Sequence, residues 1–111
     1  MKFVSLEKSN KPKKKLVITF SDPKLTIHFG SKNSSTFLDH HDEVKRVNYL
    51  KRHIVNEDWN QVNAGSLSAY LLWGPSTDLN TNLINYLNDF DIESREGVNA
   101  RTAKRLVLVN N

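Results

Sequence analysis

The strongest constraint on the fold is a predicted β-hairpin between residues 16 and 29. Leu16 to Phe20 and Leu25 to Phe29 are short runs rich in β-branched and aromatic residues, and the second run alternates apolar with polar side chains. Both features are typical of strands. The intervening Ser-Asp-Pro-Lys (21–24) is a turn sequence, because Asp bonds the backbone ahead of it and Pro fixes φ at the second position. We therefore expect the two runs to pair as a hairpin.

A helix is predicted over residues 42–55. Val44, Val47 and Ile54, with Leu50 or Lys51 between them, recur at helical spacing, which is the pattern of an apolar face packed on a core. Acidic residues stand at the start of this segment and basic residues at its end, as the helix dipole favours. Asp39 is the expected N-cap.

Two further helices are predicted downstream, each opened by a hydroxyl residue. Ser66 opens a short helix that ends at Trp73 and is apolar on nearly every side, so it should be central. Ser76 or Thr77 opens the last helix, which carries a leucine at every fourth position. The predicted core comprises Ile18, Phe20, Ile27, Phe29, Val47, Leu50, Ile54, Leu71, Trp73, Leu83 and Leu87.

These elements predict an α+β fold in which a β-hairpin packs against three helices. The chain has 111 residues, a length typical of one domain. We expect a basic N-terminal arm over residues 1–15, a compact domain over 16–91 and a C-terminal extension over 92–111. Strand-like residues near both ends can widen the hairpin into a larger sheet.

Composition excludes several classes of protein. The sequence has no cysteine, which rules out a disulfide scaffold, an iron–sulfur site, a thiol nucleophile and any cysteine-based zinc site. The first 15 residues lack the apolar segment of a secretory signal, and no apolar run has the length of a membrane span. We therefore expect no membrane span. The formal net charge of +4 is compatible with a polyanionic partner.

Two groups of residues are candidates for small-ligand chemistry, and neither completes a known signature. Residues 39–42 (Asp-His-His-Asp), with His28 and His53, offer metal-type ligands. They lack a metal-binding helix spacing, and an N-capping Asp beside exposed histidines is the simpler interpretation. The loop at residues 28–32 has one glycine, hydroxyls and a lysine, but not the P-loop pattern. We therefore predict a non-enzymatic protein with no catalytic residue, metal, cofactor or small-molecule substrate.

Basic residues interleaved with an aromatic ring indicate a nucleic-acid surface. Cations neutralise phosphates, and a tyrosine can stack on a base. The candidate residues are Lys13, Lys14, Lys15, Lys45, Arg46, Tyr49 and Arg52. They support this interpretation only if the lysine-rich arm and the helix face converge in the fold; otherwise they form an ordinary solvated surface.

Several segments between residues 15 and 90 together resemble a known family. They include Thr-Ile-His-Phe-Gly-Ser-Lys (26–32), Lys-Arg-x-x-Tyr-Leu-x-Arg-His (45–53) and Ala-Gly-x-Leu-Ser-x-Tyr-Leu-Leu-Trp-Gly (64–74). As a set they resemble short uncharacterised proteins encoded by large nucleocytoplasmic DNA viruses of algae and protists. The resemblance implies a viral origin and carries over no catalytic residue.

The first functional hypothesis is therefore a structural virion component, for example a minor capsid protein that is made in the host cytoplasm and contacts other capsid proteins. Strand-like ends can add a strand to the sheet edge of a neighbouring protein. The expected interface residues are Phe3, Val4, Leu6, Leu106, Val107, Leu108 and Val109. The alternative hypothesis is a nucleic-acid-binding accessory protein that uses the basic residues above.

Overall fold

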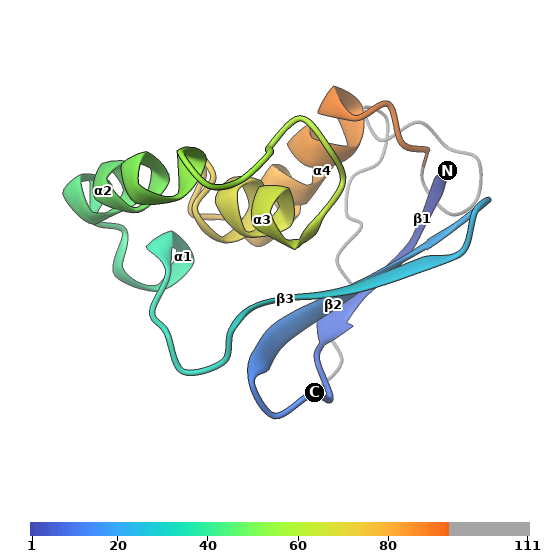
Figure 1. Ribbon diagram of the computed structural model, residues 1–111, viewed down its shortest axis with the longest axis horizontal. Coiled ribbons are helices and arrows are strands. Elements are labelled where there is room, and N and C mark those ends of the chain that lie inside the picture. Colours follow the sequence, from blue (N-terminus) through green and yellow to red (C-terminus); the bar gives the residue numbers. More distant parts are fainter. Residues whose placement is uncertain (94–111) are drawn as a thin grey trace.

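A three-stranded antiparallel sheet forms one layer of the protein, and helices cover one of its faces (Figure 1). A computed structural model describes residues 1–93. The strands are β1 (Lys2–Lys8), β2 (Lys14–Ser21) and β3 (Leu25–Ser31), in the order β1-β2-β3. The predicted hairpin is β2 with β3, and the N-terminal strand widens it as expected. The fold class is α+β.

The inner face of the sheet carries the apolar side chains that the alternation predicted. Phe20 lies opposite Phe3 on β1 and Leu25 on β3, and Leu16 lies opposite Phe29 on the hairpin. Phe3, Phe20 and Phe29 are at most 1 % exposed. These rows of rings and branched side chains form the floor of the core, on which the helices pack.

Residues 2–8 belong to the sheet and not to an arm, which corrects the sequence-based boundary at residue 16. Phe3 and Leu6 are each 1 % exposed within the core cluster, so two of the expected interface residues are unavailable to a partner. Val4 is half-buried beside the point where the β1–β2 register shifts. The other expected interface residues, Leu106–Val109, lie outside the described part of the chain.

The helical layer contains more pieces than the three predicted helices. Its elements are α1 (Phe37–His40), α2 (Glu43–Ile54), α3 (Ala64–Leu67), the π-helical turn η1 (Ser68–Leu72) and α4 (Leu79–Asp89). The N-caps also differ from the expected residues. Asp42, not Asp39, accepts the first backbone N–H groups of α2, and Asp78 caps α4. Within residues 1–93, no helix has the length and apolar character needed to cross a membrane.

Helix α2 is rotated from the predicted orientation, so that only part of the predicted apolar stripe faces the core. Val47 and Ile54, expected in the core, are 38 % and 56 % exposed, and Val44 is 70 % exposed. The inward face instead carries Arg46 and Tyr49, both of which contact Trp73. Most of the other predicted core residues are buried, while Ile27 and Leu50 are partly buried against the core.

Replacing Ile54 with serine should therefore change the free energy of unfolding by no more than about 0.5 kcal/mol, as for most exposed positions. Isoleucine and serine have similar helix propensities, so the substitution tests packing alone. Urea denaturation followed by circular dichroism measures the difference. A loss above about 2 kcal/mol would instead indicate a core residue, as the periodicity predicted.

Candidate functional site: a cleft between the sheet and helix α2

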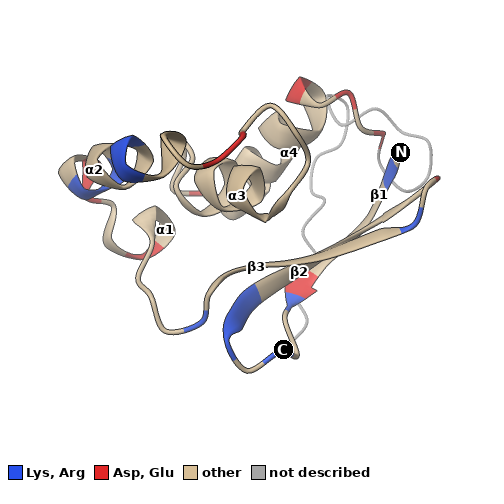
Figure 2. Ribbon diagram, in the orientation of Figure 1, with Lys and Arg blue, Asp and Glu red and all other residues tan. Residues whose placement is uncertain are grey.

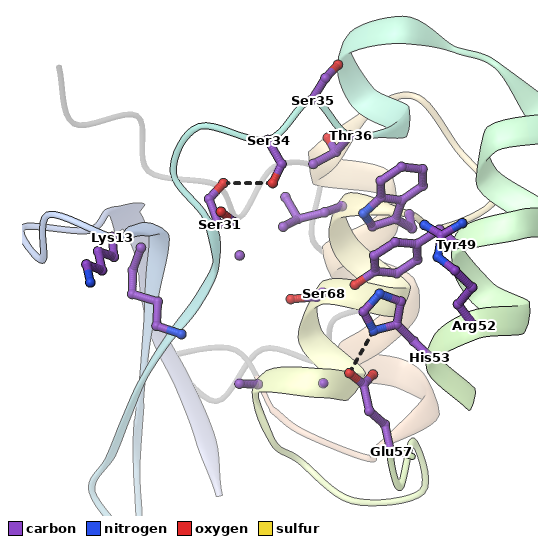
Figure 3. Close-up of a pocket in the computed structure, with 16 residues that line it drawn as sticks. Lys13, Ser31, Ser34, Ser35, Thr36, Tyr49, Arg52, His53, Glu57 and Ser68 are labelled. Atoms are coloured by element: carbon purple, nitrogen blue, oxygen red, sulfur yellow. Dashed lines mark hydrogen bonds and ion pairs between the residues drawn. The ribbon is translucent and has the colours of Figure 1, made fainter. Parts of the chain in front are cut away.

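A cleft of about 740 Å³ opens between one end of the sheet and helix α2 (Figure 3). One wall comes from the start of β2, the end of β3 and the loop that follows it, and the other comes from α2, Glu57 and Trp73. The floor is α3 with η1. The residues that line the cleft include Lys13, Lys14, Gly30, Ser31, Ser35, Tyr49, Arg52, His53, Glu57, Ala64, Gly65, Ser68, Leu72 and Trp73.

The hollow depends on small residues at its floor and sheet wall. Gly30 has φ +80°, and a Cβ there would lie 2.7 Å from Leu72 Cδ1. A Cβ on Gly65 would lie 3.0 Å from Glu57 Oε1. Glycine therefore lets β3 approach the helical layer closely, and it leaves room for the Glu57 carboxylate.

The helix wall is a stack of three rings. Tyr49 lies parallel to Trp73, with centroids 4.2 Å apart, and His53 stacks on Tyr49 at 4.0 Å. Figure 3 shows Tyr49 and His53 stacked, with the Tyr49 hydroxyl directed toward Ser68. Burial raises the pKa of Tyr49 to about 12. With a ring on each face, Tyr49 presents its edge and hydroxyl to the cleft, so the expected stacking of a base on this ring is not available in this conformation.

The structure brings together basic residues from the two predicted segments. Lys13 and Lys14 line the sheet side of the cleft, and Arg52 lines the helix side. Lys45 lies in an adjoining hollow of about 230 Å³, which Arg52 and Trp73 also line. These four cations therefore border two neighbouring depressions.

The other two predicted basic residues make internal contacts. Arg46 Nε donates to the carbonyl oxygens of Trp73 and Gly74, and its Nη1 contacts Glu43 at 2.7 Å. Lys15 Nζ donates to the Ser34 carbonyl oxygen at 2.9 Å. We therefore assign both side chains a structural role, fastening α2 and the loop after β3.

The sheet end of the cleft is positively charged. Lysines gather at the start of β2 and after β3 (Figure 2). The pKa of His28 is lowered by burial first and then by the charges of Lys11 and Lys14. The far end of the cleft is acidic, where Glu57 accepts hydrogen bonds from Trp59 Nε1 at 2.8 Å and contacts His53 Nδ1 at 3.1 Å.

The residues considered for metal or enzymatic chemistry are dispersed. His53 lines the main cleft and His40 the smaller hollow, whereas His28 bonds Ser9. The Asp39 carboxylate accepts the Thr36 backbone N–H, which lowers the pKa of Asp39. Among residues 1–93, no group of three or more His, Cys, Asp or Glu side chains is placed to hold a metal ion.

Residues 4–53 match the model of a protein family described as a family of unknown function, DUF5754. The match runs from β1 through most of α2, so it includes both basic segments and excludes the cleft floor and Trp73. No curated protein and no solved structure gives a match. The resemblance to proteins of large DNA viruses stays a prediction.

Proposed function

We propose that the protein binds nucleic acid through the basic cleft, as a non-enzymatic accessory protein. The observation that carries the proposal is the convergence of Lys13 and Lys14 with Arg52 at one cleft. Lys13 precedes β2, Lys14 is its first residue and Arg52 lies on α2, so only the fold joins them. Charges that converge in this way are the condition for a nucleic-acid surface built from these two segments.

Electrostatics favour a polymer of phosphates as the ligand. A row of cations neutralises several phosphates together and releases their counterions, which gives affinity at low salt. The lysines at the sheet end are mostly exposed, so they can reach a ligand that extends beyond the cleft. Lys45 and Arg52 continue the row on α2.

A role inside a virion rests on the sequence resemblance. The burial of Phe3 and Leu6 removes part of the surface through which strand addition was expected. We therefore rank a structural role in the virion second. The two proposals are compatible, because a nucleic-acid-binding protein can itself be packaged. Mass spectrometry of purified particles tests the location directly, and absence from the particle would reject it.

Reversing two charges at the cleft should weaken nucleic-acid binding at least tenfold. The variant is Lys14→Glu with Arg52→Glu, measured by fluorescence anisotropy with a labelled oligonucleotide at several salt concentrations. The wild-type slope of log K against log [salt] should be about −3 for four phosphate contacts, and about −1 to −2 in the variant. Both side chains are exposed, so folding should be preserved.

The matched control is Lys24→Glu with Lys51→Glu, which removes the same charge elsewhere. Lys24 lies in the β2–β3 turn and Lys51 on the outer side of α2, and both are exposed. Equal losses from the two double variants would mean that net charge, and not the cleft, drives binding. No binding by the wild-type protein at low salt would end the proposal.

A further inference from the structure

We infer that the nucleic acid taken by this cleft is a single strand, with one unpaired base in the cleft and the neighbouring phosphates on its basic rims. This inference rests on the proposed function and goes further, because charge alone does not distinguish a single strand from a duplex. The shape and lining of the two depressions carry the distinction.

The cleft has the size of a site for a compact ligand. Its volume of about 740 Å³ lies within the roughly 300–1,000 Å³ typical of ligand pockets. Gly30 and Gly65 keep side chains out of it. A duplex presents phosphates on a convex outer surface and keeps its bases paired inside, so it has no group that would fill such a recess. An unpaired base does.

The apolar, acidic and basic residues of the lining occupy different parts of the cleft, so a base and a phosphate are favoured at different positions. The lining includes Tyr49 together with the largely buried Leu72 and Trp73, and their apolar atoms suit the body of a base. Glu57 repels a phosphate but can accept hydrogen bonds from the amino or imino groups of a base. The cations Lys13, Lys14 and Arg52, by contrast, are exposed residues on the two sides of the cleft. A phosphate is therefore favoured at the rims and a base inside.

The smaller hollow has the size and the basic residues of a binding site for one phosphate. Lys45, Asn48 and Arg52 line it, and it shares Arg52 and Trp73 with the main cleft. His40 Nδ1 accepts the Asp42 backbone N–H, so the ring proton is on Nε2. That buried Nε2 has no hydrogen-bond partner among the described residues. Because His40 lines this hollow, we assign a bound phosphate oxygen as the acceptor for that N–H.

The experiment compares three ligands with the full-length protein at one salt concentration. They are a single strand of about 12 nucleotides, the corresponding duplex, and the same single strand with abasic residues at alternate positions. We expect the intact single strand to bind at least tenfold more tightly than the duplex, because a base inside the cleft removes apolar surface from water. The abasic strand should lose most of that preference.

A variant with a large side chain beside the cleft provides a second test. Ser35→Trp should bring the single-strand affinity down to the duplex level, because the indole would compete with the base for the cleft. Ser35 is an exposed loop residue that lines the cleft, whereas Asn33 in the same loop is exposed and does not line it. Asn33→Trp is therefore the control and should keep the preference.

The possible outcomes separate the two proposals. Duplex binding as tight as single-strand binding, or an abasic strand that binds as well as the intact one, would overturn the single-strand inference and leave the proposed function standing. A failure of all three ligands to bind at low salt would overturn the proposed function, and the inference with it.

Discussion

Replacing Trp73 with alanine is expected to lower the free energy of unfolding by about 3–5 kcal/mol, the usual cost of removing a large buried ring. Trp73 is 9 % exposed and contacts Tyr49 face to face. It also packs against His40, with ring centroids 5.3 Å apart. The truncation would leave a cavity beside Tyr49 and remove a lining residue of both depressions, so it should also weaken the single-strand preference.

Trp59 provides the matched control, because it is the other tryptophan of the chain. It is only half-buried, contacts the Tyr70 ring edgewise and donates to Glu57. Trp59→Ala should therefore lower the free energy of unfolding distinctly less than Trp73→Ala does. Trp73→Phe should restore a flat ring and so recover part of the stability lost in Trp73→Ala. Urea denaturation followed by circular dichroism avoids the change in tryptophan fluorescence. Equal costs for the two alanine variants would contradict a central role for the ring stack.

The β-hairpin could be predicted because its signals are local. Alternation and the Asp-Pro turn lie within residues 16–29, and the residues that face each other across the two strands follow directly from the turn. Strand β1 was harder to assign to the core. Residues three apart, such as Phe3 and Leu6, point to opposite faces of a regular strand. The register shift between Phe3 and Ser5 brings them to the same face, and the sequence alone does not indicate this shift.

The orientation of α2 could not be predicted from its periodicity. Val44, Val47 and Ile54 do form a stripe, but periodicity does not say which stripe faces inward. That choice depends on residues distant in sequence: Arg46 bonds the Trp73 carbonyl, and Tyr49 stacks on the Trp73 ring. Polar and aromatic contacts therefore outweigh the burial of three aliphatic side chains.

The candidate site was predictable in its charges but not in its shape. Lysine and arginine are easily recognised in a sequence, and Lys14 and Arg52 both line the cleft. The hollow itself comes from residues that carry little signal, such as Gly65 and Ser68. The sequence did not indicate Glu57 as a site residue either, because an acidic residue in a polar loop is common. Only the fold shows that it lines a cleft with basic residues.

Asn82, on helix α4, makes hydrogen bonds to the backbone on both sides of Trp73. It is 1 % exposed, and its Nδ2 donates to the carbonyl oxygens of Leu71, at 3.0 Å, and Ser76, at 2.8 Å. Its Oδ1 accepts the Ser76 backbone N–H at 3.1 Å. One side chain thus satisfies three backbone groups on either side of Trp73 and Gly74, where the π-helical turn ends.

Replacing Asn82 with alanine should lower the free energy of unfolding by about 2–4 kcal/mol, because each buried polar group left without a partner costs about 1–3 kcal/mol. Asn82→Leu keeps the volume but makes none of these hydrogen bonds, so it should remain destabilising. Asn82→Asp keeps the shape but replaces the donor with an acceptor, and it should be at least as costly as alanine.

The control for these variants is Asn85→Ala, on the same helix. Asn85 is exposed, and alanine has the higher helix propensity, so this change should be neutral or slightly stabilising. Because Asn82 reaches the cleft only through the 71–76 segment, a folded Asn82→Ala protein should also lose part of its single-strand preference at temperatures well below its melting point. A leucine variant as stable as the wild type would show that packing alone, and not these hydrogen bonds, holds the turn that carries Trp73.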